Sequence, residues 1–396
     1  MNTDISRNLR KTAAFILGMV ILLLPYLTYI QIFQSAALAS HPLNHRSLEI
    51  TASHEQGKIL DRKGVVLAHS KPDGQGKFQR EYLYGPVFAH IIGYDSRNYG
   101  KTGVENSYSN YLSGGINTWR KFGAINRLII PARGDDIQLT IDAGIQQVAY
   151  RALGKFKGAV VVMNPRTGEL LALVSKPSFD PNNVDSEWSA IVRDPTSPLL
   201  DRATQGLYPP GSTIKIMMAD AALKEGIADL KRKFYCDGSL VIGNYVLSES
   251  HSVAHGPVSL EQALTVSCNV TFGKLAIELG RDRLSKTFDR YGFLQPTDSE
   301  LAEAQSHLPN FGHLSDGELA QIGIGQGSLL VTPLRMAMLV SAFANGGKVM
   351  EPFLASKVTD QNGVWLKDFS PRPWLTVTSP AGADIIRNMM ITVVEE

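Results

Sequence analysis

The run of residues 12–33, TAAFILGMVILLLPYLTYIQIF, constrains this chain most, because it contains no formally charged side chain. A helix of that length is long enough to cross the hydrocarbon core of a bilayer. Arg7, Arg10 and Lys11 stand directly before the run, and positive charges favour the cytoplasmic side of a membrane. The sequence therefore predicts a cytoplasmic N-terminus over 1–11, a transmembrane anchor over 12–33, and the bulk of the protein outside the membrane.

A cleavable signal peptide is the alternative interpretation of the same apolar run. Ala37-Leu38-Ala39 has the small-x-small form of a cleavage site. The apolar core at 13–24, however, ends well before that site, and apolar residues continue through Ile32. Since a cleavable signal is cut close to its apolar core, the pattern favours an anchor that is retained.

The size and the charge balance of the chain restrict its organisation and its partners. With 396 residues, the chain is too long for one ordinary core, so we expect two folded domains after the apolar run. Lys and Arg number 39 and Asp and Glu number 37, without a basic block. Nothing therefore indicates binding to nucleic acid. The two cysteines, Cys236 and Cys268, fit either a disulfide or two free thiols.

Two hairpins can be predicted from local patterns. Alternating apolar residues around the turn at Lys63-Gly64 predict a hairpin over 54–70. The clearest hairpin lies at 158–175, where the turn residues of 164–168 separate two apolar strands.

The remaining patterns suggest where one domain ends and the next begins. A short alternating strand at 134–142 is followed by a helix that continues through Ala152. Beyond the second hairpin, residues 177–347 are mostly helical in pattern. We therefore predict an α+β fold, with a small mixed β-rich domain over 45–150 and a second domain over 155–396.

The stretch YPPGSTIK (208–215) combines a chain break with two side chains suited to nucleophilic chemistry. Two prolines and a glycine interrupt the chain, and a helix is predicted from Ser212 to about Gly226. Lys215 lies one turn after Ser212, so its amine can reach the hydroxyl. Burial lowers the pKa of a lysine, which can then act as the base that a serine nucleophile needs. Taken alone, the pair also fits a helix cap followed by a solvated lysine.

A second polar motif, the tripeptide SCN at 267–269, favours the catalytic interpretation. Ser259 and Gln262 form a predicted capping box for one helix, and apolar periodicity predicts a further helix that Gly280 closes. The tripeptide lies on the loop between these helices, where its hydroxyl and carboxamide can face Ser212. The hydroxyl can relay a proton, and the carboxamide can hold a peptide-like substrate.

With these two motifs the chain resembles the penicillin-binding proteins, and more closely the class B group of membrane-anchored D,D-transpeptidases that cross-link peptidoglycan. Ser-x-x-Lys followed by a Ser-x-Asn element is typical of this superfamily. The resemblance extends over nearly the whole chain through three further segments: GKILDRKGVVLA (57–68), where the arginine usual before the first glycine is Gln56, GKTGVENSYSNYLSGG (100–115), and QIGIGQGSLLVTPLRMAMLVSAFANGG (321–347).

The resemblance implies roles for particular residues and partners. The implied roles are Ser212 as the acylated nucleophile, Lys215 as its general base, Ser267 as the proton relay, and Asn269 as the group that binds the substrate amide. The donor would be the D-Ala-D-Ala end of a stem peptide, and β-lactams would be covalent inhibitors. A bacterial membrane location, a membrane glycosyltransferase partner and no cofactor are also implied. The domain over 45–150 would be a non-catalytic pedestal or dimerisation domain, and 155–396 a transpeptidase domain with an antiparallel sheet and helices.

One element of the family pattern does not occur where it is expected. After Val331 the sequence contains no Lys-Thr-Gly or Lys-Ser-Gly. This predicts a transpeptidase domain that is incomplete at its C-terminus, with doubtful activity in this chain. Two other interpretations stay open: a β-lactamase or β-lactam sensor of the same superfamily, and a non-catalytic scaffold of a cell-wall synthesis complex.

Two further matches carry little weight. Lys101-Thr102-Gly103 spells the third motif and Ser96-Arg97-Asn98 a second Ser-x-Asn, but both precede the serine–lysine pair, against the family order. We therefore assign both to the non-catalytic domain. His251 and His255 have the spacing of zinc ligands on a helix, but no glutamate stands beside His251, and Gly256-Pro257 breaks the helix. No metal site is predicted from this pair.

Overall fold

The computed structural model describes residues 2–30, 34, 55–74, 76–114, 133–250 and 253–395. The signal-peptidase-like site at 37–39, the stretch 45–54 and His251 lie outside the described residues. The chain divides into two compact units, one of residues 1–55 with 72–79 and one of residues 56–71 with 80–396.

The first unit contains the helix α1 (Asn2–Tyr29), which begins before the charge-free run. Large apolar side chains of α1 are exposed, for example Leu22, which is 74% exposed. Among the helices of the described residues, none reaches the combination of length and apolarity that a membrane crossing requires. The structure therefore does not confirm the predicted anchor over 12–33.

A six-stranded sheet with the order β15-β14-β6-β1-β2-β3 runs through the described residues. Asp61 accepts hydrogen bonds from the backbone N–H groups of Lys63 and Val65 and so shapes the turn between β1 and β2, which confirms the first predicted hairpin. The parallel pairing of β1 with β6 confirms the strand predicted at 134–142. The strands are β1 (Ile59–Leu60), β2 (Val66–Pro72), β3 (Phe78–Tyr82), β6 (Asp136–Leu139), β14 (Ala355–Thr359) and β15 (Trp365–Asp368).

One side of this sheet comes from a distant part of the chain. β14 pairs antiparallel with β6, with Val358 opposite Ile137, and both side chains are fully buried. β15 then pairs with β14 at the edge. The sequence pattern did not predict that residues 355–368 join strands from the first part of the chain.

The second predicted hairpin is present as β7 (Gly158–Met163) and β8 (Leu170–Lys176), an antiparallel pair. The helix α8 (Ala143–Ala152) packs on β8, and α14 (Pro333–Ala344) packs against β7. Asp142 caps α8 by accepting the N–H groups of its first turn. The predictions of a hairpin at 158–175 and a helix through Ala152 are therefore confirmed.

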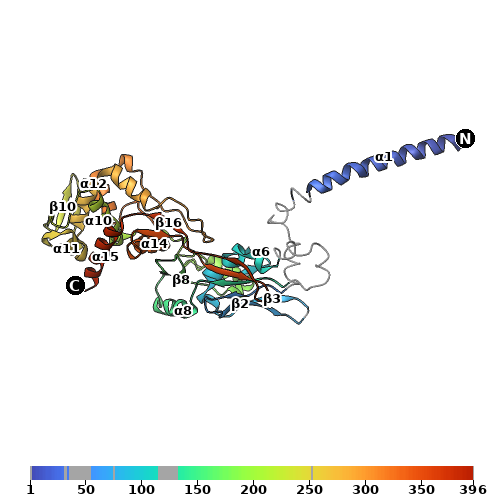
Figure 1. Cartoon of the computed structure of the whole chain (residues 1–396), viewed down its shortest axis with the longest axis horizontal. Coiled ribbons are helices and arrows are strands. Elements are labelled where there is room, and N and C mark those ends of the chain that lie inside the picture. The colour runs from blue at the N-terminus through green and yellow to red at the C-terminus, as the bar shows by residue number, and fades with distance from the viewer. Residues whose placement is uncertain are drawn as a thin grey trace. The chain divides into compact units, whose positions relative to one another are not determined.

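Four helices pack together near the SCN tripeptide. In this group α10 (Lys215–Lys224) contacts α11 (Leu260–Thr265), α12 (Asn269–Arg290) and α15 (Pro380–Glu395) (Figure 1). The predicted capping box of Ser259 and Gln262 is present at the start of α11. Gly280, with a φ of 71° and a ψ of 175°, is a non-helical kink that separates two helical segments within α12. The predicted helix therefore ends at Gly280, and a second helical segment follows it directly.

The prediction of mostly helical structure over 177–347 was wrong in one region. Short strands occupy 233–259, where β9 pairs with β12 and β10 with β11. Each covers only four residues, and Gly238 and Gly243 take positive φ at the turns between them. β10 and β11 are joined by the two-residue turn Gly243-Asn244, a hairpin signal that the sequence analysis overlooked. These strands are β9 (Lys233–Cys236), β10 (Ser239–Ile242), β11 (Tyr245–Ser248) and β12 (Gly256–Ser259).

The other elements connect these parts. They are η2 (Gly85–Val87), α4 (Ala89–Ile92), β4 (Asp95–Ser96), β5 (Gly100–Lys101), α5 (Gly103–Ser107), α6 (Ser109–Leu112), η4 (Pro181–Asn183), α9 (Val184–Arg193), η7 (Phe311–His313), α13 (Asp316–Gly323), β13 (Lys348–Met350) and β16 (Pro373–Thr376).

Candidate active site

Ser212 lies in a short 3-10 helix, η5 (Gly211–Ile214), and its side chain is exposed. Just before η5, Tyr208 exchanges two backbone hydrogen bonds of 2.9 Å with Val331. The first residue of η5 donates its N–H to the carbonyl of Gly325 at 2.9 Å. A Cβ at Gly325, whose φ is +72°, would lie 2.1 Å from a backbone oxygen of η5. Glycine is required there, and this close contact fixes the stretch that carries Ser212.

Lys215 is the first residue of α10 and is fully buried, with 0% of its surface exposed. Its Nζ donates to the carbonyl of Ser267 at 2.6 Å, to Ser267 Oγ at 3.0 Å and to Asn269 Oδ1 at 2.8 Å. Within the described residues, no hydrogen bond joins Nζ to Ser212. Burial lowers the pKa of Lys215 to about 8, although the negative charge of Glu249 opposes this change. The amine can therefore accept a proton near neutral pH.

Ser267 has a φ of 53°, a left-handed conformation that glycine usually occupies. Its N–H donates to the carbonyl of Leu264 at 3.0 Å, and the N–H of Cys268 donates to Ala263 at 2.8 Å. These are the two bonds of a Schellman motif at the end of α11. A side chain in this conformation costs roughly 1 kcal/mol. In this arrangement both the carbonyl and the hydroxyl of Ser267 accept from Lys215.

Asn269 is the first residue of α12, and its Nδ2 donates to the carbonyl of Ser248 at 3.1 Å. The carboxylate of Glu249 accepts the N–H groups of Asn269 at 2.9 Å and Val270 at 2.7 Å. Burial opposes ionisation of Glu249, but these N–H bonds and two thiol donors outweigh it and lower its pKa. Glu249 is therefore an anionic cap on α12, and sequence reasoning missed it.

The structure joins three of the four sequence-predicted site residues in one hydrogen-bonded group, the Lys215 network of Lys215, Ser267 and Asn269. Ser212 stands three positions before the lysine, in the preceding turn. A buried amine, a hydroxyl and a carboxamide next to an exposed hydroxyl can activate that hydroxyl and carry its proton onward.

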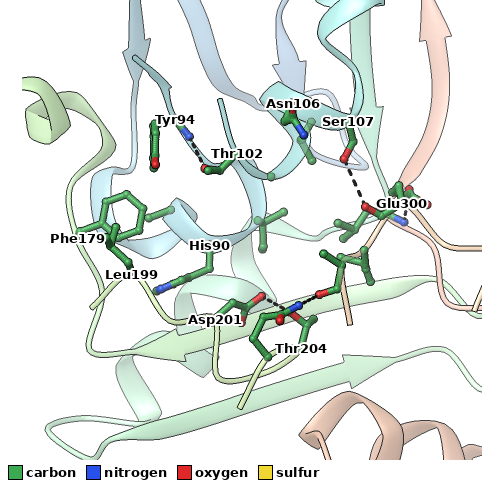
Figure 2. A pocket seen from close by; sticks show the side chains of 18 residues that line it. His90, Tyr94, Thr102, Asn106, Ser107, Phe179, Leu199, Asp201, Thr204 and Glu300 are labelled. Carbon is green, nitrogen blue, oxygen red and sulfur yellow. Dashed lines mark hydrogen bonds between the residues drawn. The ribbon is translucent and has the colours of Figure 1, made fainter. Parts of the chain in front are cut away.

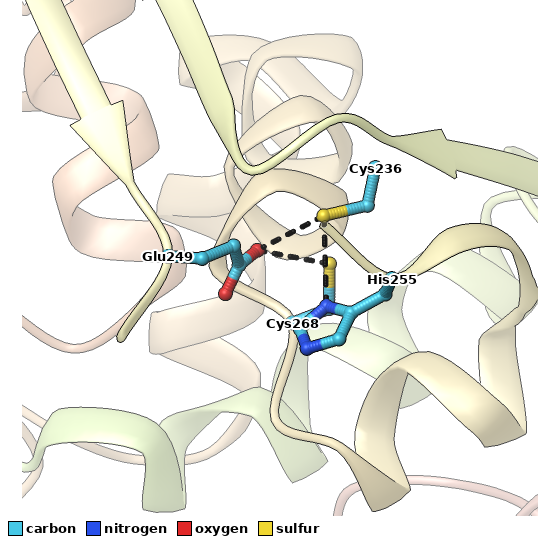
Figure 3. A group of neighbouring side chains, drawn as sticks. All are labelled: Cys236, Glu249, His255 and Cys268. Carbon is cyan, nitrogen blue, oxygen red and sulfur yellow. Dashed lines mark hydrogen bonds between the residues drawn. The ribbon is translucent and has the colours of Figure 1, made fainter. Parts of the chain in front are cut away.

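Two cysteines, a glutamate and a histidine gather beside the SCN tripeptide (Figure 3). One potential ligand atom from each of Cys236, Glu249, His255 and Cys268 lies within 4.8 Å of the others, so the group could hold a metal ion. Both cysteines are buried free thiols. The sequence pattern missed this cluster because we tested His255 only against His251. The available signal was the pairing of both cysteines with a histidine and a glutamate between them.

The tripeptides 101–103 and 96–98, which the sequence analysis assigned to the non-catalytic domain, contact other residues of the protein. Lys101 forms an ion pair of 2.8 Å with Asp95, and a Cβ at Gly103 would lie 2.6 Å from the carbonyl oxygen of Ile91. Ser96 donates to Asp185 at 2.5 Å. These contacts give both tripeptides a role in packing.

A cavity of about 390 Å³ is lined by residues from 89–107, 199–205 and 300–302, and none of the four predicted site residues lines it. His90 and Asp201 face it (Figure 2). Burial lowers the pKa of His90 and raises the pKa of Asp201. His90 bonds the carbonyl of Pro198, and Asp201 accepts from Thr204. Because these polar groups already have partners in the protein, we assign the cavity no ligand.

Comparisons with known proteins bear on the whole chain. Residues 158–396 match the family model for the penicillin-binding protein transpeptidase domain, and residues 56–125 match the penicillin-binding protein A dimerisation domain. The chain is 31% identical to the peptidoglycan D,D-transpeptidase PbpA of Mycolicibacterium smegmatis, over 99% of this chain and 82% of that protein.

Solved structures show the same similarity. The ceftriaxone acyl-enzyme complex of penicillin-binding protein A from M. tuberculosis superposes with a TM-score of 0.82 at 30% identity, covering 88% of this chain and 82% of that one. The D,D-transpeptidase domain of a peptidoglycan glycosyltransferase from Eggerthella lenta has a TM-score of 0.79 at 33% identity, covering 87% and 82%. The predicted α+β fold is therefore confirmed.

Proposed function

Because the chain belongs to the class B penicillin-binding proteins, we propose that it cross-links peptidoglycan by D,D-transpeptidation through an acyl-serine intermediate and binds penicillins covalently. The observation that carries the proposal is the buried Lys215, bonded to Ser267 and Asn269 one turn after the exposed Ser212. The acyl-enzyme complex of a relative with the same fold supports it. The interpretations as a scaffold or as a β-lactamase or sensor are not favoured.

The acylation step starts from neutral Lys215. The ammonium form has three N–H groups for its three acceptors. Loss of one proton leaves a lone pair, and the amine then turns from one of these acceptors to accept from Ser212. The Ser212 oxygen then attacks the carbonyl of the penultimate D-Ala, and its proton moves to Lys215. The first N–H groups of a helix lack partners within the helix, and N–H groups of this kind next to Ser212 would suit the oxyanion that forms.

Release of the terminal D-Ala needs a proton on its nitrogen. The contact of 3.0 Å between Lys215 Nζ and Ser267 Oγ supplies a route by which that proton passes from the lysine through the hydroxyl to the leaving amine. The carboxamide of Asn269 holds the amide of the substrate. The same route in reverse removes a proton from the acceptor amine, which attacks the acyl-Ser212 ester and forms the cross-link.

Labelling of the full chain with a fluorescent penicillin tests this function. Wild type should bind the label covalently, Ser212→Ala should lose it, and Lys215→Ala should react about a thousandfold more slowly. Thr213→Ala is the matched control, since Thr213 is the neighbouring exposed hydroxyl and donates to Pro210. Labelling that persists in Ser212→Ala would place the nucleophile elsewhere. An unlabelled wild type would contradict activity in this chain and support the doubt raised by the sequence.

We propose in addition that residues 12–33 anchor the chain in the bacterial membrane, with 1–11 in the cytoplasm and the transpeptidase domain outside. The support is the charge-free run and the preceding basic residues. Protease added to intact spheroplasts should digest the large domain. Protection of that domain, or a mature N-terminus at Ser40, would contradict this topology.

We propose a membrane glycosyltransferase as a partner of this chain. Cross-linking consumes stem peptides on newly polymerised glycan strands, so a polymerase that supplies these strands should act nearby. Reconstitution in vesicles tests this proposal: cross-linking by the full chain should rise when a lipid-substrate glycosyltransferase shares the vesicle, and should not rise when it occupies separate vesicles.

A further inference from the structure

The four side chains that gather beside the SCN tripeptide come from the ends of four elements. Cys236 is the last residue of β9, Glu249 follows β11, His255 precedes β12, and Cys268 is the N-cap of α12. The pairing of β9 with β12 places Cys236 opposite Gly256, next to His255. A backbone bond of 3.0 Å from Glu249 to Gly238 brings the carboxylate to the same place.

The distances within this group suit one small ion. Cys236 Sγ lies 3.5 Å from both Glu249 Oε1 and His255 Nδ1, and Cys268 Sγ lies 3.0 Å from Glu249 Oε1. Ligand atoms around a tetrahedral zinc lie about 3.3–3.8 Å apart, as bonds of about 2.0–2.3 Å require. These three separations match that range to within a few tenths of an ångström, and all the ligand atoms lie within 4.8 Å of one another. Two thiolates, an imidazole and a carboxylate together are a ligand set typical of zinc.

We propose that this Cys–Glu–His–Cys cluster (Cys236, Glu249, His255 and Cys268) binds one zinc ion that positions the SCN tripeptide. Cys268 stands between Ser267 and Asn269, the two partners of Lys215. Glu249 also holds the N–H of Asn269. An ion bound by both Cys268 and Glu249 would therefore fix the backbone that carries two members of the Lys215 network. The effect on acylation rests on the proposed function, whereas the zinc site does not.

Two other states of the same thiols compete with zinc. A Cys236–Cys268 disulfide would suit an oxidising compartment, but it would use neither His255 nor Glu249. Two protonated thiols that donate to Glu249 would leave the imidazole only its contact of 3.5 Å with Cys236 Sγ. His255 is half-buried while its three neighbours are buried, so an ion has a route to the site along the histidine.

Metal binding by the purified full chain tests the site. After incubation with Zn²⁺ and removal of free ions, wild type should retain about one equivalent. In its place Co²⁺ should give thiolate charge-transfer absorption and tetrahedral ligand-field bands. Cys236→Ser and His255→Ala should lose both signals, while His313→Ala, which removes an exposed histidine of η7, should keep them. Circular dichroism of each variant separates loss of metal from loss of folding.

The wild-type measurements keep the proposal falsifiable without any variant. Only trace zinc together with no cobalt–thiolate absorption would overturn it. So would a Cys236–Cys268 disulfide found by mass spectrometry in the chain isolated from cells without reductant.

Penicillin labelling of the same samples separates this inference from the proposed function. Removal of zinc by a chelator should slow acylation roughly tenfold or more, and added Zn²⁺ should restore the rate. A full rate in the stripped chain would overturn the positioning role. A chain that acylates but never binds zinc contradicts the zinc site alone, and a chain that binds zinc but never acylates contradicts the proposed function alone.

Discussion

The position of Lys215 sets its chemistry at the scale of a single residue. A side chain with no exposed surface loses the hydration that stabilises an ammonium ion, and burial lowers the pKa of Lys215 to about 8. The amine donates only to neutral acceptors, and the nearby charge of Glu249, which favours the ammonium form, does not outweigh burial. The residue is therefore suited to act as a base.

The pH profile of acylation should follow this pKa. A base acts in its neutral form, so the acylation rate should rise with pH through about 8 and become constant above it. Stopped-flow measurement of penicillin acylation between pH ~6 and ~10 checks this, provided folding is unchanged over the range. A midpoint near 10.5, the ordinary value for lysine, would contradict the role of burial. Lys215→Ala is the control and should lack the rise.

Substitution of Ser267 should separate its chemical role from its backbone role. Ser267→Gly and Ser267→Ala both remove the hydroxyl, and acylation by each should fall about a hundredfold or more. Glycine tolerates the φ of 53°, so Ser267→Gly should be more stable than Ser267→Ala by roughly 1 kcal/mol. Thermal unfolding and penicillin labelling check the two effects. Equal stability of the two variants would contradict the Schellman assignment.

Ser212 and the residues of the Lys215 network could be predicted because they all stand in short sequence motifs. Ser212 and Lys215 lie three apart, and the SCN tripeptide needs only one loop between two capped helices. Glu249 and Cys236 could not be found in this way. They approach Cys268 only because β9 pairs with β12 and β10 pairs with β11.

At the scale of elements, a buried ion pair joins the strand β3 to the helix α5. Arg80 Nε donates to Glu105 Oε1 at 2.6 Å, and Arg80 Nη1 donates to the carbonyl of Gly57 at 2.7 Å. The side chains are 4% and 0% exposed. Burial raises the pKa of Glu105 although the charge of Arg80 opposes this change. The glutamate depends on its arginine partner, since an isolated buried carboxylate is costly.

Removal of one partner should therefore cost more than removal of both. Arg80→Met should lower the free energy of unfolding by about 3–5 kcal/mol, because it leaves Glu105 buried without its partner. Arg80→Met with Glu105→Leu should recover much of that loss. Urea unfolding of the three proteins checks this. A double variant no more stable than Arg80→Met would contradict the assignment of the cost to the orphaned carboxylate.

The two predicted hairpins could be found from their local turns, whereas pairings with distant strands left no signal in the sequence. Both predicted hairpins have turn residues that make their own hydrogen bonds, such as Asn164 in the second hairpin, which accepts from Arg166. The turn between β14 and β15 makes such bonds too, since Asp360 accepts from Asn362 and Val364, but the sequence analysis did not identify this hairpin. The place of β14 in the sheet depends on β6, which lies far earlier in the chain.

At the scale of the whole molecule, Glu300 ties together segments from three regions of the chain. Its Oε1 accepts from the hydroxyl of Tyr108 at 2.9 Å and from the N–H groups of Leu354 at 2.8 Å and Ala355 at 2.9 Å. The three donor residues are each at most 5% exposed. Ala355 begins β14, so one carboxylate fixes the point at which the late strand joins the early sheet.

Glu300→Ala should weaken this junction strongly. The substitution leaves three buried donors without an acceptor, at about 1–3 kcal/mol each, so we expect a loss of at least about 3 kcal/mol in the free energy of unfolding. Glu278→Ala is the matched control, because Glu278 pairs with Arg232 while both side chains are more than a third exposed, and such pairs contribute under about 1 kcal/mol. Denaturant unfolding gives both values, and hydrogen exchange at Leu354 and Ala355 should accelerate only in Glu300→Ala. Similar losses in the two variants, or unchanged exchange at those amides, would show that β14 is held in the sheet by its strand pairing alone.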